Sequence, residues 1–264
     1  MKSILITGAC GGLGKAAVLE FSRRGFTVYA ADISSCKWDD PSIIPVPMDV
    51  TSEESIESAA GKIEKLDAIL HLAGTYTMDS FIEIPPETLE KMLAVNLMGV
   101  YRVNRAFFPK LSKSGGRIII VASELAPLDP LPFNGVYSMT KRALDGYAHS
   151  LALELDLIGV RVTTVYPGAY GDGMTRAAVR SMERMSETSK LYPDIADRFR
   201  SIVLRETGNT KPPEALAKKL ADLAEKKRPP FRAFMNNSLK LRLFSMLPMG
   251  AQAFLLGLLL KGKK

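Results

Sequence analysis

Short apolar runs alternate along the chain with segments whose apolar residues recur at helical spacing. The runs cover residues 3–7, 26–31, 43–48, 67–72, 117–122 and 160–166. Continuous runs of this length are typical of strands buried on both faces of a parallel sheet. Their alternation with helices predicts a doubly wound α/β fold of about seven parallel strands, with helices on both faces of the sheet.

The segments between the runs predict helices at residues 15–24, 51–63, 86–96, 99–111, 137–159 and 212–227. Thr51 and Glu54 have the spacing of a capping box at the start of the second helix. We expect one domain over residues 1–237, in which residues from about 169 to 210 form a substrate loop and helices that cross the ligand cleft. Residues 238–264 form a basic, apolar helical tail.

The residues that end the apolar runs are glycines, carboxylates, a serine and a proline. In a parallel sheet the carboxyl ends of the strands meet at one edge, where ligands bind. We therefore expect one ligand site to gather these residues, which are Gly8, Asp32, Asp49, Gly74, Ser123 and Pro167.

The first run leads into a glycine-rich turn at residues 8–14 and then into a helix. Glycines allow the backbone to approach a pyrophosphate, and a helix N-terminus offers free N–H groups to it. An ordinary tight turn is the alternative. The order of strand, turn and helix favours a dinucleotide site.

Asp32 ends the second strand, beyond the glycine-rich turn. A carboxylate there accepts hydrogen bonds from the ribose hydroxyls of NAD and repels the 2′-phosphate of NADP. No Lys or Arg stands at Cys10, Gly11 or Ile33 to bind that phosphate. The sequence therefore favours NAD over NADP, with a helix or turn cap as the other role for a single aspartate.

Tyr137 and Lys141 share one face of a predicted helix, one turn apart, and Ser123 ends the preceding strand. A free phenol has a pKa of about 10, which is too high for a base near neutrality. An ammonium group beside it favours the phenolate and permits proton exchange with an alcohol or a ketone. The pair alone is weak support, because Tyr and Lys at this spacing occur by chance in many helices.

Composition narrows the possibilities further. Apolar residues make up 47% of the chain and charged residues 24%, as in ordinary folded proteins. Cys10 and Cys36 lack metal-ligand spacing, so we expect no metal, free thiols and a reducing, cytoplasmic compartment. The strand beginning at Ser3 leaves no room for a signal peptide. The net charge of +7 arises from residues 201–264, so we expect no nucleic-acid partner.

Over roughly residues 1–175 these motifs resemble those of the short-chain dehydrogenase/reductase family. The matches fall in the family's glycine motif, its adenine-contacting pair, its Ala-Gly turn, its structural asparagine and its active site. They are, in that order, Thr7, Gly8, Gly12 and Gly14; Asp49 and Val50; Ala73 and Gly74; Asn96; and Ser123, Tyr137 and Lys141. The resemblance implies a Rossmann-type fold and, as in hydroxysteroid- and retinol-converting members, an alcohol or ketone substrate.

The resemblance also implies a role for each matching residue. Tyr137 exchanges a proton with the substrate oxygen, which Ser123 hydrogen-bonds. Lys141 lowers the pKa of the tyrosine and binds the nicotinamide ribose, while Asn96 holds a water between Lys141 and solvent. The expected cofactor contacts are Gly8, Cys10, Gly12, Leu13, Gly14, Asp32, Ile33, Asp49, Val50, Ala73, Gly74, Tyr137, Lys141, Pro167, Gly168 and Tyr170.

Three positions depart from the family pattern. The interval from Ser123 to Tyr137 is one residue longer than the commonest interval, which implies a small loop insertion. Asp172 replaces a threonine that contacts the nicotinamide amide, and Thr175 is the nearest substitute. His71 replaces an asparagine, and we expect it to pack or to support the backbone rather than to catalyse.

The C-terminal tail is apolar and basic, since no charged residue lies between Arg242 and Lys261. Pro248 and the glycines at 250 and 257 interrupt it and predict two short helices. Three placements are open: packing on the cleft or on a partner subunit, contact with an anionic membrane surface, and a spanning helix. By resemblance, we expect a homodimer or homotetramer that pairs through the helices beginning near residues 99 and 137.

The expected function is that of an NAD-dependent oxidoreductase that interconverts a secondary alcohol and a ketone, or an alcohol and an aldehyde. An apolar substrate of lipid metabolism, such as a steroid, a retinoid or a long-chain alcohol, suits the tail. Met174, Met182 and Met185 are candidates for its pocket, with helix packing as the alternative. Two other classes are an epimerase or dehydratase using the same Tyr-Lys pair, and a binding protein that senses NAD(P).

Overall fold

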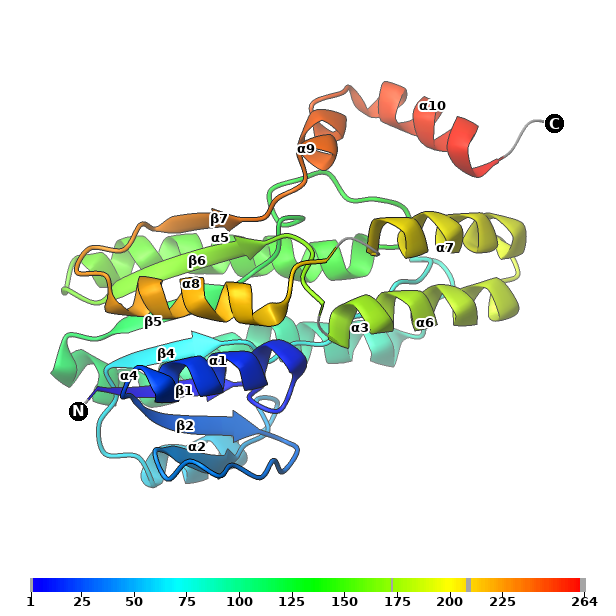
Figure 1. Ribbon diagram of the computed structural model, residues 1–264. Coiled ribbons are helices and arrows are strands. Elements are labelled where there is room, and N and C mark those ends of the chain that lie inside the picture. Colours follow the sequence, from blue (N-terminus) through cyan, green and yellow to red (C-terminus); the bar gives the residue numbers. More distant parts are fainter. Residues whose placement is uncertain (1, 172, 208–209, 262–264) are drawn as a thin grey trace.

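Seven parallel strands form one sheet in the order β3-β2-β1-β4-β5-β6-β7 (Figure 1). The computed structural model describes residues 2–171, 173–207 and 210–261. Asp172 lies outside the described residues, as does the side chain of Thr175. Helices cover both faces of the sheet, which confirms the doubly wound parallel fold.

The strands are short, and those in the middle of the sheet are buried. They are β1 (Ser3–Thr7), β2 (Thr27–Asp32), β3 (Ile43–Pro47), β4 (Ala68–His71), β5 (Arg117–Val121), β6 (Arg161–Pro167) and β7 (Arg232–Met235). β1 pairs with β2 on one side and with β4 on the other, so the direction of winding reverses at β1. β7 was not located from the sequence, because it is an exposed edge strand without a continuous apolar run.

Two groups of helices sandwich the sheet. α1 (Gly12–Arg23) and α8 (Pro213–Glu225) bury their apolar sides on one face. α2 (Glu53–Gly61), α4 (Gly99–Ser114) and α5 (Gly135–Asp156) cover the other face. α3 (Pro86–Leu93), α6 (Gly173–Thr188) and α7 (Pro193–Thr207) lie beyond the carboxyl ends of the strands (Figure 1).

The start of α2 differs from the predicted capping box. Ser52 is the N-cap, and its hydroxyl accepts a hydrogen bond from the backbone N–H of Ser55 at 3.2 Å. Thr51 instead donates its hydroxyl to Asp49 Oδ1 at 2.7 Å. The carboxylate at the end of β3 binds the threonine hydroxyl, so the next residue caps the helix.

The tail forms two short helices, as predicted: α9 (Leu239–Ser245) and α10 (Met249–Leu260). Part of α10 packs on the protein, because Leu260 is buried beside α7 and Gln252 donates to Asp129 Oδ2 at 2.8 Å. Its other face leaves Phe254, Leu258 and Leu259 more than half exposed, at 66%, 62% and 63%. Among the described residues, no helix has the length and apolarity needed to cross a bilayer.

Two of the three methionines proposed for a substrate pocket belong to the protein core instead. Met182 and Met185 are 0% and 1% exposed and pack with Phe199 of α7 and Leu260 of α10. They hold α6, α7 and the tail together, which is the alternative of ordinary helix packing.

His71 is buried at the end of β4 in a polar network. Its Nε2 lies 2.8 Å from Asn104 Oδ1, and Asn104 Nδ2 donates to the Tyr147 hydroxyl at 3.1 Å. Because the amide oxygen only accepts, His71 carries its proton on Nε2. The histidine thus ties β4 to α4 and α5, in agreement with its expected packing role.

Burial of His71 should make the stability of the protein depend on pH. Burial lowers the pKa of His71 to about 4 from the usual 6.5. Between these values the unfolded state binds more protons than the folded state, so the free energy of unfolding should fall as the pH falls, by up to about 3 kcal/mol. Urea unfolding across this pH range measures the effect. His71→Asn should remove that part of the slope, and an unchanged slope in the variant would contradict the assignment.

Candidate active site

The glycine-rich turn passes under the turn that follows β4. Gly8 has φ of +71°, and a Cβ added to it would lie 2.6 Å from the backbone nitrogen of Ala73. A Cβ on Gly14 would lie 2.0 Å from Gly8 O. Thr7 Oγ1 accepts hydrogen bonds from the backbone N–H groups of Leu72 and Ala73 at 3.2 and 3.1 Å. Gly8 therefore lets the two turns meet backbone to backbone, and Gly14 lets the start of α1 pack against the backbone of Gly8 and Ala9.

The N-terminus of α1 is open to an anion. No side chain caps it, and its first turn contains no acidic residue. Its backbone N–H groups and the positive end of its dipole suit a pyrophosphate. Gly11 and Gly12 are exposed at the start of α1, and because they have no side chains they leave its N-terminus uncovered.

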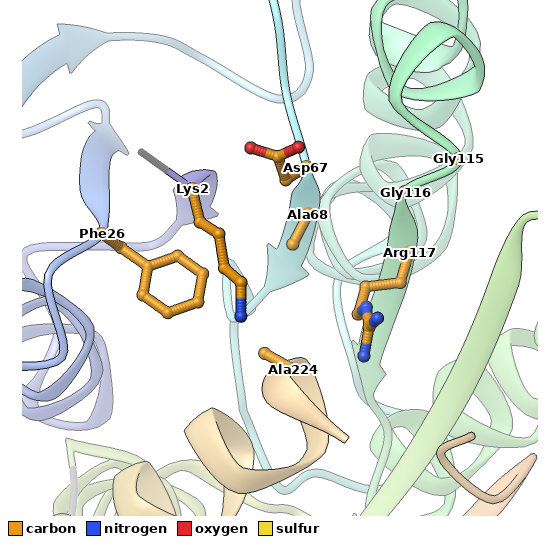
Figure 2. A pocket seen from close by; sticks show the side chains of 8 residues that line it. All are labelled: Lys2, Phe26, Asp67, Ala68, Gly115, Gly116, Arg117 and Ala224. Atoms are coloured by element: carbon orange, nitrogen blue, oxygen red, sulfur yellow. The ribbon is translucent and has the colours of Figure 1, made fainter. Parts of the chain in front are cut away.

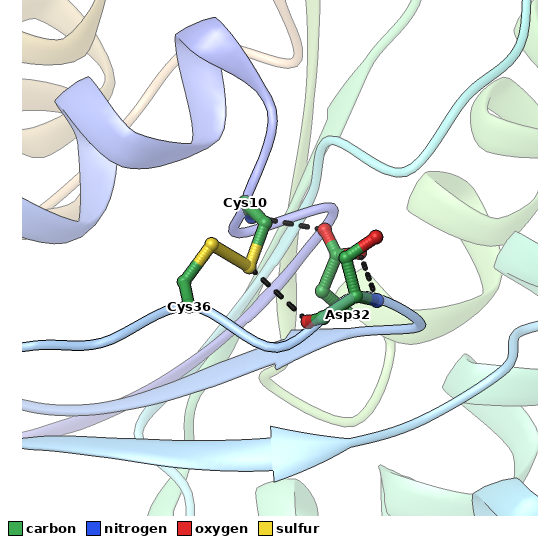
Figure 3. Close-up of a disulfide and its surroundings, with 4 residues drawn as sticks. Cys10, Asp32 and Cys36 are labelled. Carbon is green, nitrogen blue, oxygen red and sulfur yellow. Dashed lines mark hydrogen bonds between the residues drawn. A yellow bond between two sulfur atoms is a disulfide. The ribbon is translucent and has the colours of Figure 1, made fainter.

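Asp32 stands beside this helix end. Its carboxylate accepts hydrogen bonds from the backbone N–H groups of Cys10 at 2.9 Å and Ser34 at 2.8 Å (Figure 3). These two bonds fix its orientation, and each oxygen keeps a lone pair for another donor. An anion site and an oriented carboxylate next to each other fit the pyrophosphate and the ribose of a dinucleotide.

Cys10 and Cys36 form a disulfide, so the expectation of free thiols was wrong (Figure 3). Their Cα atoms are 5.9 Å apart, because the segment after β2 folds back beside the glycine-rich turn. Spacing along the chain does not reveal this approach. The bridge ties the turn to the segment after Asp32, and it removes the basis for expecting a reducing compartment.

The other expected cofactor residues of β2 and β3 lie at the same edge. Ile33 is 77% exposed directly after β2. Asp49 follows β3 and accepts hydrogen bonds from the backbone N–H and the hydroxyl of Thr51. Val50 is buried, and its side chain lies 2.8 Å from where a Cβ on Gly99 would stand.

Of the expected cofactor residues at and after the end of β6, Pro167 and Gly168 lie at this edge, whereas Tyr170 is packed in the core. Gly168 follows Pro167 and packs against Asn236, since a Cβ on it would lie 2.0 Å from Asn236 O. Tyr170 differs from its neighbours, because it is 4% exposed and packs in the core with residues of α8. Its expected contact with the cofactor stays a prediction.

Tyr137 and Lys141 occupy the first turns of α5, facing the end of β5. Lys141 Nζ lies 5.7 Å from the centroid of the Tyr137 ring and donates to Val121 O at 3.1 Å. Both side chains are buried, and burial lowers the pKa of Lys141 to about 8. Ser123 follows β5, and its hydroxyl accepts the backbone N–H of Leu125 at 3.2 Å. The hydroxyl proton of Ser123 is thus free to point toward a bound oxygen.

The Tyr137 side chain is bordered by two residues from other elements. The Tyr76 ring lies 4.6 Å from the Tyr137 ring, measured between centroids. Met174 Sδ, at the start of α6, lies 3.9 Å from the Tyr137 hydroxyl. Burial raises the pKa of Tyr76, which keeps it a neutral phenol. Tyr76 was not predicted from the sequence as a site residue. Its position two residues after Gly74, at a strand end, was the signal that could have identified it.

Asn96 lies in η1 (Ala94–Met98), a π-helical segment between α3 and α4. Its side chain accepts the backbone N–H of Thr75 at 2.8 Å, and donates to Thr75 O at 2.9 Å and to Thr140 Oγ1 at 3.1 Å. The amide thereby joins the turn after Gly74 to Thr140 of α5, the residue before Lys141. The water expected near Asn96 stays a prediction.

A separate small cavity lies at the opposite edge of the sheet. Figure 2 shows Lys2 and Arg117 directed toward it, near Ala224 of α8. It measures about 140 Å³ and adjoins the amino ends of β1, β4 and β5. Because the glycine-rich turn and Tyr137 are at the carboxyl ends, this cavity is not part of the site.

Comparison with known proteins agrees with this geometry. The family model described as short chain dehydrogenase matches residues 2–183. A 3-ketodihydrosphingosine reductase from Bacteroides thetaiotaomicron is 28% identical over 87% of this chain and 86% of its own length. An NADPH-dependent 1-acyldihydroxyacetone phosphate reductase from Schizosaccharomyces pombe is 30% identical over 77% of this chain and 70% of its own.

A solved structure has the same fold. The 3-ketoacyl-(acyl-carrier-protein) reductase from Brucella melitensis, complexed with NADH, superposes with a TM-score of 0.72 at 22% identity. The match covers 89% of this chain and 96% of that one. The chain belongs to the short-chain dehydrogenase family. It is an oxidoreductase with an NAD(P)-binding Rossmann fold that acts on a small substrate, and enzymes of this family often form oligomers.

Proposed function

We propose that the protein is an NAD-dependent enzyme that interconverts a secondary alcohol and a ketone, or an alcohol and an aldehyde, on a lipophilic substrate. The observation that carries the proposal is the position of Tyr137, Lys141 and Ser123 at the same sheet edge as the open N-terminus of α1. A dinucleotide with its pyrophosphate at α1 extends along this edge toward β5.

Each residue has a distinct task in the proposed reaction. The nicotinamide, when bound, supplies or accepts the hydride. Tyr137 donates a proton to the carbonyl oxygen in reduction and accepts it from the alcohol in oxidation. Ser123 donates a hydrogen bond to the same oxygen and polarises it. Lys141, a cation below a pH of about 8, stabilises negative charge on the tyrosine oxygen.

Asp32 supports NAD rather than NADP. Its carboxylate is held at the end of β2 by two backbone N–H groups, beside the site of the adenine ribose. The 2′-phosphate of NADP would meet this negative charge, and no Lys or Arg stands at Ile33 or Ser34 to offset it. Two like charges held side by side repel each other.

Two observations support a lipophilic substrate. Met174 and Tyr76 border the Tyr137 side chain with mostly apolar surface. The two relatives described above act, by name, on 3-ketodihydrosphingosine and on 1-acyldihydroxyacetone phosphate. The sensor alternative gains no comparable support, because a sensor does not require a buried Ser-Tyr-Lys set. An epimerase or dehydratase uses the same Tyr-Lys pair, and these two relatives are instead reductases by name.

The tail supports a second proposal, contact with a membrane surface. Phe254, Leu258 and Leu259 of α10 are exposed together on one short helix. Basic residues follow α10, and Lys240 and Arg242 lie on α9. An exposed apolar face with flanking cations is the composition of helices that rest on anionic lipid.

Replacing the proposed proton donor should abolish turnover without displacing the cofactor. Tyr137→Phe keeps the ring against Tyr76 but removes the hydroxyl, so kcat should fall by about a hundredfold or more. The affinity for NADH should change little. Absorbance of NADH with a panel of steroid, retinoid and long-chain ketones measures the rate, and Tyr101→Phe, at an exposed position on α4, is the control. Full activity of Tyr137→Phe would exclude the proposed reaction.

The membrane proposal predicts flotation with anionic vesicles. The full chain should rise with vesicles that contain phosphatidylserine and rise less with pure phosphatidylcholine. A Phe254→Ser/Leu258→Ser variant should remain in the soluble fraction, because it loses the apolar contact. Leu191→Ser, at an exposed position between α6 and α7, serves as the matched control. Equal soluble fractions for the full chain and the double variant would rule out contact through α10.

A further inference from the structure

A groove-shaped cavity of about 570 Å³ lies between α3 and α6. Its floor is the segment after Gly74, and its two walls are one face of each helix. The lining residues are Thr75, Tyr76, Thr77, Glu87, Thr88, Lys91, Met92, Ala177, Arg180, Ser181 and Arg184.

One end of this cavity adjoins the Tyr137 side chain. Tyr76 lines the cavity and also contacts Tyr137, with ring centroids 4.6 Å apart and the rings tilted by 60°. Ala177 lies almost one helical turn after Met174, whose sulfur is 3.9 Å from the Tyr137 hydroxyl. A molecule bound at Tyr137 can therefore extend along α6 into the cavity.

The cavity walls carry three cations, Lys91, Arg180 and Arg184, and one carboxylate, Glu87. Arg184 is already paired, since its guanidinium lies 2.7 Å from Asp79 Oδ2. Within the described part of the chain, Lys91 and Arg180 form no ion pair. These two cations line the cavity from α3 and α6, and its lining has more positive than negative charge.

We propose that this cavity binds an anionic group, a carboxylate or a phosphate, at the far end of the substrate whose carbonyl lies at Tyr137. The inference rests on the proposed function and specifies its substrate class. Arg180 is six residues after Met174 on α6, which places it about 9 Å further along the helix axis. The substrate is thus an amphipathic chain, with an apolar part over Tyr76, Met92 and Ala177 between carbonyl and anion.

Ion pairs at partly exposed sites are weak, so the effect of each cation is moderate. Loss of one such pair reduces affinity by about three- to fivefold, and added salt reduces the difference further. A neutral analogue of the same length gains nothing from Lys91 or Arg180. The comparison of a charged substrate with its neutral ester therefore isolates the inferred contact.

The test uses a straight-chain fatty acid with a mid-chain ketone and the methyl ester of the same acid, each with NADH. The acid should have the higher kcat/KM. Arg180→Gln and Lys91→Gln should each raise KM for the acid about three- to fivefold, and the double variant about tenfold, with the ester unaffected. Arg176→Gln, an exposed position on the same helix outside the cavity, should change neither substrate. The inference would be overturned if acid and ester had equal kcat/KM and neither variant changed these values. That outcome would leave the proposed function intact.

A binding measurement decides the inference independently of turnover. Calorimetry with decanoate and with decanol, on the full chain in the presence of NADH, should show tighter binding of decanoate. The Arg180→Gln/Lys91→Gln variant should lose this preference and bind decanol as before. If neither ketone is reduced, the panel of ketones with Tyr137→Phe still tests the proposed function, and the calorimetry still decides the anion site. Decanoate bound equally by wild type and double variant would overturn the site.

Discussion

The parallel pairing of β1 with β2 on one side and β4 on the other is the constraint on which the site depends. It brings the turns that follow these three strands to one edge of the sheet, where the winding reverses. Gly8 lets the first of these turns close against the turn after β4, and Gly14 lets α1 begin against Gly8, because any side chain at either position would overlap backbone atoms. The uncapped N-terminus of α1 and the Asp32 carboxylate then lie side by side, joined through the Cys10 backbone N–H.

Two buried contacts join the proposed proton-transfer residues to this edge. Lys141 reaches back to Val121 O, which fixes α5 against β5. Asn96 binds both the segment after β4 and Thr140 of α5 through one amide. A π-helical segment in the long run from α3 to α4 places that amide, and such segments often occur at functional sites. The turns proposed to bind the cofactor and the proposed catalytic pair are therefore held at a defined separation.

Much of the fold and the gathering of the site residues could be predicted from the sequence, because strand runs and the residues that end them are local signals. β7 was missed because an edge strand needs no continuous apolar run. The Cys10–Cys36 bridge, the contact of Tyr76 with Tyr137 and the pairing of α3 with α6 across a cavity join residues far apart in sequence. Nothing in their spacing along the chain encodes those approaches, so they required the structure.

The central claim is that the edge formed by β1, β2 and β4 binds NAD through Asp32. Fluorescence titration of NADH and of NADPH into the protein tests it most directly. The account predicts that NADH binds at least about tenfold more tightly than NADPH, and that Asp32→Asn narrows this ratio while Asp39→Asn, at an exposed position in the same loop, leaves it unchanged. Absence of NADH binding, or equal or tighter binding of NADPH to the unaltered chain, would contradict the account.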